Sequence, residues 1–333
     1  MTTSALCSEP IGPRQKEARE DTNSFLVWGP FWQLLKGFFR MITGKEVDDM
    51  DKKPLTIMKF KQMKQNQEPI TMVTAYDYPS ARLVEEAGVD VILVGDSLGN
   101  VVLGYDTTIP VTMEDMVYHT RAVARGAQHT MIVADLPFMS YHASREDALR
   151  NAARLMQEGR AHAVKMEGGE EIAEEVYACV RAGIPVIGHI GLTPQSVHQL
   201  GGYRIQGKTE QDAAELLGAA KALEQAGAFG VVLELVVEPV AEQISRALSI
   251  PTIGIGAGRG VDGQVLVYHD LLQYDPSPRP KKFVKSYADL GTTIRSAVNS
   301  YVSDVKSRAF PEEKHSFSAA ATSASPVYGS AKE

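Results

Sequence analysis

Residues 130–167 read TMIVADLPFMSYHASREDALRNAARLMQEGRAHAVKME. The stretch opens with a short apolar run that ends in Asp135, and it closes with a second such run that ends in Glu167. Between them, residues 145–157 carry apolar side chains at spacings of three and four, which is typical of an amphipathic helix. Two apolar strands joined by a helix predict a parallel βαβ unit.

The same unit recurs along residues 54–317. Strands are expected at 71–76, 89–95, 130–134, 162–166, 185–188, 229–233, 251–255 and 264–267. Helical spacing is found at 80–87, 113–125, 145–157, 170–181, 209–226 and 238–248. Continuous rather than alternating hydrophobicity indicates strands that are buried on both faces. Eight strands alternating with helices predict an α/β fold, a (β/α)8 TIM barrel. Because only residues 256–263 separate the last two strands, an open doubly wound sheet is the alternative.

Length and charge narrow the class of protein. The 333 residues carry a net charge of −7 and a pI near 5.7, which argues against a nucleic-acid partner, since such a partner needs a basic face. The two cysteines, Cys7 and Cys179, are too few for a disulfide framework. With no recognisable targeting signal at the start of the chain, they favour a cytoplasmic location.

Both ends of the chain differ from the barrel in composition. Residues 1–53 form an extension, and its segment 25–42 (FLVWGPFWQLLKGFFRMI) is rich in aromatic residues and amphipathic. This segment predicts a helix that docks on the barrel or on a neighbouring subunit. One alternative is an interfacial membrane helix in which Lys36 and Arg40 reach the headgroups, and the other is a poorly ordered segment. Residues 318–333, rich in Ser and Ala, predict a disordered tail.

In such barrels the chemistry lies where the strands end. The polar residues at those positions are Asp77, Asp96 with Ser97, Asp135, Lys165 with Glu167, His189, Glu234, and His269 with Asp270. A single Asp after a strand is often only a helix cap. Three acids and a lysine on three consecutive strands are harder to explain in that way, because buried carboxylates repel one another. A divalent cation removes that repulsion, and oxygen ligands suit Mg²⁺, with Mn²⁺ and Co²⁺ as alternatives.

A separate role is expected for each of three of these side chains. Lys165 is expected to bind a substrate carboxylate or to stabilise an enolate, and a structural ion pair with Glu167 is the alternative. Glu234, among apolar neighbours, is suited to acid–base chemistry, unless it pairs with Arg204 or Lys208. His189 either contacts a substrate oxygen or supports the residues around it.

Nine ordered motifs identify a known family. They are TAYDYPSA (74–81), LVGDSLGNVVLGYDTTIPVT (93–112), ADLPFMSY (134–141), VKMEGG (164–169), GHIGLTPQS (188–196), GGYRIQGK (201–208), IGIGAG (253–258), DGQVLVYHD (262–270) and FPEEKHSF (310–317). The core therefore resembles the ketopantoate hydroxymethyltransferases over residues 54–317. The resemblance implies a (β/α)8 barrel preceded by an N-terminal helix. It also implies a homodecamer built of two pentamer rings.

The same resemblance assigns roles at the strand ends. It implies that Asp96, Asp135 and Glu167 bind Mg²⁺, with Glu167 acting directly or through water. Asp96, Ser97, Asp135 and Lys165 would contact the oxo-acid, and Glu234 would be the proton acceptor.

The reaction implied is transfer of a hydroxymethyl group from 5,10-methylenetetrahydrofolate to 3-methyl-2-oxobutanoate through a Mg²⁺-bound enolate. The products are 2-dehydropantoate, an intermediate of pantothenate and coenzyme A synthesis, and tetrahydrofolate. Two rivals remain: a related metal-dependent C–C lyase acting on an oxo-acid, and a non-catalytic paralogue that docks through residues 25–42.

Overall fold

The computed structural model describes residues 55–275 and 281–317. The chain divides into two compact units, one of residues 1–52 with 326–333 and the other of residues 53–325. All the described residues belong to the second unit. The predictions for segment 25–42 and for the tail 318–333 therefore lie outside the described residues.

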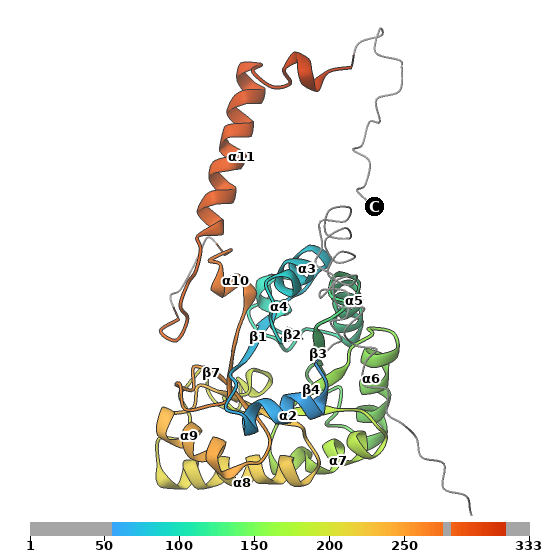
Figure 1. The fold of residues 1–333 in the computed structure, drawn as a ribbon, viewed down its shortest axis with the longest axis vertical. Helices are drawn as coiled ribbons and strands as arrows, with labels where there is room; N and C mark the ends of the chain where they lie inside the picture. The colour runs from blue at the N-terminus through green and yellow to red at the C-terminus, as the bar shows by residue number, and fades with distance from the viewer. Residues whose placement is uncertain (1–54, 276–280, 318–333) are drawn as a thin grey trace, which may run out of the picture. The chain divides into compact units, whose positions relative to one another are not determined.

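Eight parallel strands close into a barrel in the order β1 to β8, and β8 pairs with β1 (Figure 1). Their bounds are Ile70–Thr74, Val91–Val94, Met131–Asp135, Ala163–Glu167, Val186–Gly191, Gly230–Glu234, Thr252–Ile255 and Gly263–Leu266. Each overlaps its predicted strand, so the TIM barrel is confirmed and the open sheet is wrong. The short segment between β7 and β8 is a helix-free loop within the closed sheet.

Helices surround this sheet in chain order (Figure 1). The main ones are α3 (Tyr78–Glu86), α5 (Met113–Gly126), α6 (Arg145–Gln157), α7 (Ala173–Arg181), α8 (Glu210–Gln225) and α9 (Glu238–Ala247). The helix predicted over 170–181 is divided, because a 3₁₀ turn, η2 (Glu170–Ile172), precedes α7. Further elements that were not predicted are α4 (Leu98–Val101), η3 (Pro194–Ser196), α10 (Tyr268–Leu271), α11 (Leu290–Ser307) and η4 (Glu313–His315).

Helix α2 (Ile57–Gln65) precedes the barrel and closes its floor. Phe60 and Met63 of this helix are buried in one apolar cluster with strand residues from the inside of the barrel. The Phe60 ring packs edge-on against Phe229, the residue before β6, with 5.3 Å between ring centroids. This confirms the expected N-terminal helix and leaves the opposite end of the barrel, where the strands run out, for a site.

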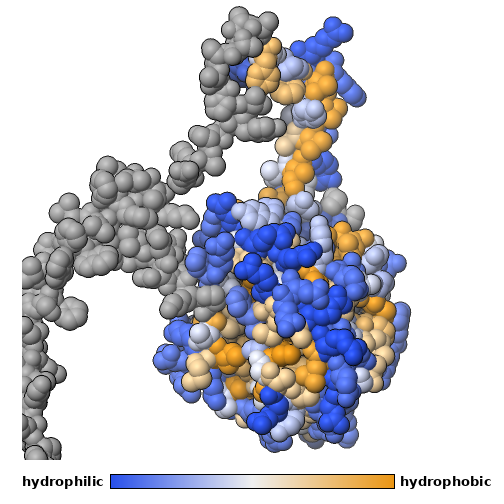
Figure 2. Space-filling model, turned by 90° about the vertical axis from the view of Figure 1, so that its right-hand side faces the viewer, coloured by the Kyte–Doolittle hydropathy of each residue, from blue (hydrophilic) through white to orange (hydrophobic). Residues whose placement is uncertain are grey.

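Helix α11 has 18 residues, and none of its side chains is buried. Five apolar side chains fall on one face of it and are exposed, among them Val298 at 53% and Tyr301 at 57%; the others are Ile294, Val302 and Val305. Figure 2 shows apolar side chains following one another along this helix. Over the described ranges, α11 included, every helix is too short or too polar to pass through a bilayer.

Candidate active site

The seven residues predicted for the site line one cavity of about 480 Å³. They are Asp96, Ser97, Asp135, Lys165, Glu167, His189 and Glu234. Asp96 and Ser97 follow β2, and Asp135, Glu167 and Glu234 are the last residues of β3, β4 and β6. The structure therefore brings together side chains from five neighbouring strands, as the strand-end positions predict.

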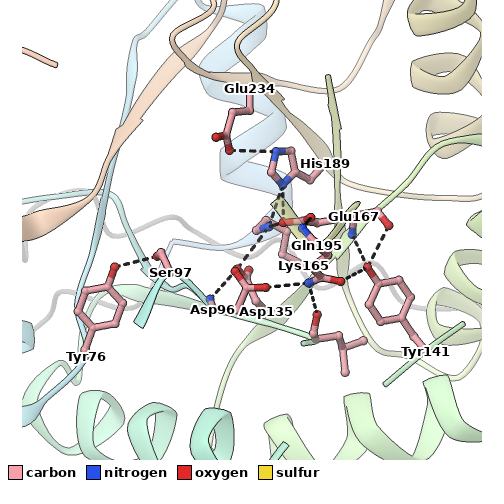
Figure 3. Close-up of polar contacts among 11 residues, drawn as sticks. Tyr76, Asp96, Ser97, Asp135, Tyr141, Lys165, Glu167, His189, Gln195 and Glu234 are labelled. Carbon is pink, nitrogen blue, oxygen red and sulfur yellow. Dashed lines mark hydrogen bonds and ion pairs between the residues drawn. The ribbon is translucent and has the colours of Figure 1, made fainter. Parts of the chain in front are cut away.

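The strand register places the charged groups beside one another. Asp135 of β3 lies opposite Lys165 of β4, and Glu167 of β4 lies opposite His189 of β5. Lys165 and Glu167 are two residues apart on one strand, so both side chains point to the same face of the sheet. Here that face is the inside of the barrel, where Figure 3 shows the side chains converging.

One lysine sits among three buried carboxylates. Lys165 Nζ lies 3.4 Å from Asp135 Oδ2 and 3.4 Å from Glu167 Oε1. Burial alone lowers the pKa of Lys165, but the charges of Asp135, Glu167 and Asp96 outweigh it and raise that pKa, so the amine stays charged. Burial raises the pKa of Glu167, yet Lys165 and His189 reverse this effect and bring the pKa to about 2. The ion pair considered as an alternative for Lys165 is thus present, and it includes Asp135 as well.

Asp96 and Asp135 are the two carboxyl groups of the cluster whose pKa values are raised. Burial raises the pKa of Asp96 well above its usual value, and the charges of Glu167 and Asp135 add to it. Burial also raises the pKa of Asp135, although Lys165 offsets part of the shift. The two residues are closely joined, because the Asp96 backbone N–H donates to Asp135 Oδ2 at 3.0 Å. A Cβ at Gly95 would lie 2.7 Å from Ser97 Oγ and 3.5 Å from Asp135 Oδ2, so glycine there permits this approach.

The donor set fits a hard divalent cation. Asp135 Oδ1 is buried and, in the described part of the chain, has no hydrogen-bond partner. Such an oxygen needs a ligand, and a cation would also relieve the repulsion that raises the pKa of Asp96. Across residues 55–275 and 281–317, no three His, Cys, Asp or Glu side chains by themselves enclose a metal ion.

His189 lies between two glutamates. Its Nδ1 is 3.2 Å from Glu167 Oε1, and its Nε2 is 3.3 Å from Glu234 Oε2. Burial and Lys165 lower the pKa of His189, but the two glutamates overcome both and raise it to about 9. Nδ1 also lies 3.0 Å from Lys165 Nζ, and the buried Nε2 makes no hydrogen bond to a described residue, so the geometry is compatible with both roles expected for His189. Glu234 thus has His189 as its ionic neighbour, rather than Arg204 or Lys208.

Other polar groups at the site were not predicted. The Tyr76 hydroxyl lies 2.8 Å from Ser97 Oγ, and Tyr141 and Gln195 connect the carboxylates from behind (Figure 3). Tyr141 and Gln195 are uncharged residues inside the motifs ADLPFMSY and GHIGLTPQS, so only membership of those motifs could have suggested them. Asp77 has the simpler role expected of such residues, because its side chain caps α3 by accepting from the Ser80 N–H at 2.8 Å.

The comparisons with known protein families and with curated relatives agree on one family. The family model for ketopantoate hydroxymethyltransferase matches residues 54–313. A 3-methyl-2-oxobutanoate hydroxymethyltransferase of Geobacillus thermodenitrificans is 60% identical over 258 residues, covering 78% of this chain and 92% of the relative. One from Carboxydothermus hydrogenoformans is 59% identical over 266 residues, covering 80% and 96%.

Solved structures of other enzymes share the fold. A phosphonopyruvate hydrolase superposes with a TM-score of 0.53 at 13% identity, covering 79% of this chain and 92% of the other. A phosphoenolpyruvate phosphomutase from Streptomyces platensis gives 0.50 at 17% identity, covering 75% and 88%. At such identities only the barrel is shared. The family match and the relatives at about 60% identity span the barrel and its site. They make this chain a hydroxymethyltransferase, and it belongs to the ketopantoate hydroxymethyltransferase family.

Proposed function

We propose that the chain transfers a hydroxymethyl group from 5,10-methylenetetrahydrofolate to 3-methyl-2-oxobutanoate, with water as co-reactant. The products are 2-dehydropantoate, for pantothenate synthesis, and tetrahydrofolate. The oxo-acid is the one in the relatives' name, and the folate donor comes from the resemblance of the motifs. The observation that carries the proposal is the cavity, in which three buried carboxylates and Lys165 stand beside an apolar wall.

The two ends of the oxo-acid match the two kinds of lining. Lys165, Ser97 and the two aspartates, Asp96 and Asp135, supply charge and hydrogen bonds for its carboxylate and keto oxygens. Leu93, Val232, Ile255 and Val265 line the same cavity and suit the branched carbon end. The substrate would then lie with its C3 hydrogen toward the apolar side, where Glu234 also lines the wall.

Asp96 and Asp135 are the residues that would hold Mg²⁺. Both oxygens of Glu167 already have partners: Oε1 faces Lys165 and His189, and Oε2 accepts from the Gln195 N–H at 3.0 Å. Glu167 is therefore better placed to act through a water than as a direct ligand. When bound, Mg²⁺ would supply Lewis acidity at the oxo-acid oxygens, which makes the C3 hydrogen more acidic.

Glu234 is the base that this arrangement provides. Its carboxylate accepts the C3 proton, and His189 Nε2 lies 3.3 Å from it. Lys165, which stays charged, offsets the negative charge that develops on the substrate oxygens as the proton leaves. The C3 carbon then forms a bond to the one-carbon unit of the folate as one of that unit's two C–N bonds breaks. The oxygen of water replaces the second nitrogen and becomes the hydroxymethyl oxygen, while the proton held by Glu234 and one proton of water pass to the two nitrogens, which gives tetrahydrofolate.

The outer part of the cavity has room for the folate. A volume of about 480 Å³ lies in the range that holds drug-sized ligands, which is more than a small oxo-acid needs. Tyr203, Leu235 and Phe283 line it and offer apolar and aromatic surface for a flat heterocycle. Lys281, also at this cavity, adds positive charge suited to the glutamate tail.

Exchange of the C3 hydrogen tests the proposal. In D₂O with Mg²⁺, we expect the oxo-acid to lose its C3 proton signal by NMR before any folate is added, and EDTA should abolish this loss. Where exchange is absent, tetrahydrofolate is added, because a second ligand can be needed before the proton moves. No exchange under either condition would contradict the proposal. Exchange combined with folate-independent cleavage of an oxo-acid aldol would favour a C–C lyase instead.

We also propose a homo-oligomer, a decamer by resemblance, in the cytoplasm. Its support in the structure is the apolar face of α11, which the described part of the chain leaves exposed. An unpartnered apolar helix face is typical of a surface that a second copy covers.

Changing Val298 to Asp should separate the copies. A charge at the centre of this face would lose its hydration in the interface, so we expect sedimentation velocity to show a shift toward the 36.2 kDa monomer. Ser303→Asp on the opposite face of α11 is the matched control and should leave the mass unchanged. An unchanged mass for Val298→Asp would show that this face is not the interface.

A further inference from the structure

We propose that Gln195, braced by Tyr141, is a positioning residue that fixes the Asp96 and Glu167 carboxylates, so that its loss weakens divalent-cation binding. This inference rests on the proposed function. Gln195 itself lies behind the carboxylates and is 3% exposed. Figure 3 shows it between Asp96, Glu167 and Tyr141.

Every hydrogen-bonding group of the Gln195 side chain is used. Its Nε2 donates to Asp96 Oδ2 at 2.9 Å and to the Leu136 carbonyl at 2.9 Å. Its Oε1 accepts from the Tyr141 hydroxyl at 2.9 Å. Its backbone N–H donates to Glu167 Oε2 at 3.0 Å. One residue of η3 therefore joins groups that follow β2, β3 and β4.

The partners fix which way the amide points. The nitrogen side faces a carboxylate and a carbonyl, which can only accept, so both amide hydrogens have a use there. With the amide turned over, its oxygen would face two acceptors and its nitrogen would face the hydroxyl. That arrangement would leave the Leu136 carbonyl and Asp96 without a donor, in a buried place where an unpaired polar group is costly.

Tyr141 braces the amide from the other side. Its ring is fully buried, and its hydroxyl accepts from the Glu167 N–H at 3.0 Å. The single hydroxyl hydrogen is shared between the Glu167 carbonyl and Gln195 Oε1, both at 2.9 Å. The phenol thus ties the backbone of Glu167 to the side chain that holds Asp96.

Asp96 depends on this support more than its neighbours do. Asp135 and Glu167 each have Lys165 within 3.4 Å. For Asp96, the one hydrogen bond to its carboxylate from any described residue comes from Gln195. Because like charges surround Asp96, a carboxylate without this donor would turn away from the cluster, and one cation ligand would be misplaced.

Mn²⁺ binding to the EDTA-treated full-length protein tests the proposal, with free Mn²⁺ followed by electron paramagnetic resonance. Gln195→Met keeps the length and volume of the side chain but removes both donors, and we expect the Mn²⁺ dissociation constant to rise about 10- to 100-fold. Tyr141→Phe keeps the ring and should raise it less. The double variant should show less than the product of the two single effects, since both variants act through one network.

Thr120→Val is the matched control. Thr120 is buried in α5 and its hydroxyl donates to the Met116 carbonyl at 2.6 Å, so this change removes a buried hydrogen bond of a residue that does not line the cavity. It should lower the melting temperature without changing Mn²⁺ affinity. A Gln195→Met protein that loses thermal stability but binds Mn²⁺ like the wild type would overturn the inference. If that variant does not fold, an unchanged affinity in Tyr141→Phe would do so. A wild-type protein that does not bind Mn²⁺ would overturn the proposed metal site as well.

Discussion

Replacing Glu234 with Gln is expected to lower turnover by about 10²- to 10⁴-fold, the range for losing a general base. Glutamine has the same shape and keeps a polar atom near His189, which lies 3.3 Å from the native carboxylate. It cannot accept the C3 proton. Binding of 3-methyl-2-oxobutanoate, measured by calorimetry in the presence of Mg²⁺, should change little, because Lys165 and the aspartates hold the charged end.

Exchange of the C3 hydrogen in D₂O should fall in the same proportion as turnover. Glu242→Gln serves as the control, since Glu242 lies in α9 in an ion pair with Arg246 on the surface. That variant should turn over at the wild-type rate. An unchanged exchange rate in Glu234→Gln would assign the C3 proton to another base and remove Glu234 from this step.

Replacing Lys165 with Met should have the largest effect on stability. The side chain is 5% exposed and forms ion pairs with two carboxylates, and breaking such a buried pair by removing one partner costs about 3–5 kcal/mol. Since the pKa of Lys165 is raised in the folded protein, its contribution is fully present below the unfolded pKa of about 10.4 and is lost only as pH rises through the folded pKa. The loss should therefore be measured by urea unfolding near pH 7.5, without metal.

Lys64→Met is the matched control for Lys165. Lys64 forms a partly buried pair with Asp262 at 2.8 Å, near the floor of the barrel. Both variants should be less stable, but only Lys165→Met should also lose affinity for the oxo-acid. If the two variants bind the oxo-acid equally well, Lys165 is a structural ion pair and not a substrate contact.

The barrel could be predicted from the sequence because its signals are local. Each strand is a short apolar run, and each main helix from α3 to α9 has apolar residues at helical spacing. The strands and helices of residues 54–275 could therefore be assigned without knowing which of them pack together. Helix α11 was missed although Ile294, Val298 and Val302 recur at intervals of four. Its apolar face has no strand after it to complete a βα repeat, and the βα repeat is the signal that marks the helices of the barrel.

The charged half of the site could be predicted for the same reason, since parallel strands bring their ends to one side of the barrel. Gln195 and Tyr141 could not. Their role depends on three loops that meet next to Asp96. The local sequence does not show which carbonyl or carboxylate a neutral side chain will contact. The split of the predicted helix at η2 is likewise not visible in the helical spacing: the residue before η2 lies against α8, where a Cβ on Gly169 would come 2.6 Å from Ala219 Cβ.

The closed floor of the barrel has a kinetic consequence. With Phe60 and Met63 filling one end, ligands and products share the mouth at the other end. Under the proposed function, the charged groups that would hold the oxo-acid lie at the buried ends of the strands, and the surface that would take the folate lies outside them. For two ligands in such a one-ended chamber we expect a compulsory order of binding: the oxo-acid enters first, the folate covers it, and the hydroxymethylated acid leaves only after tetrahydrofolate has gone.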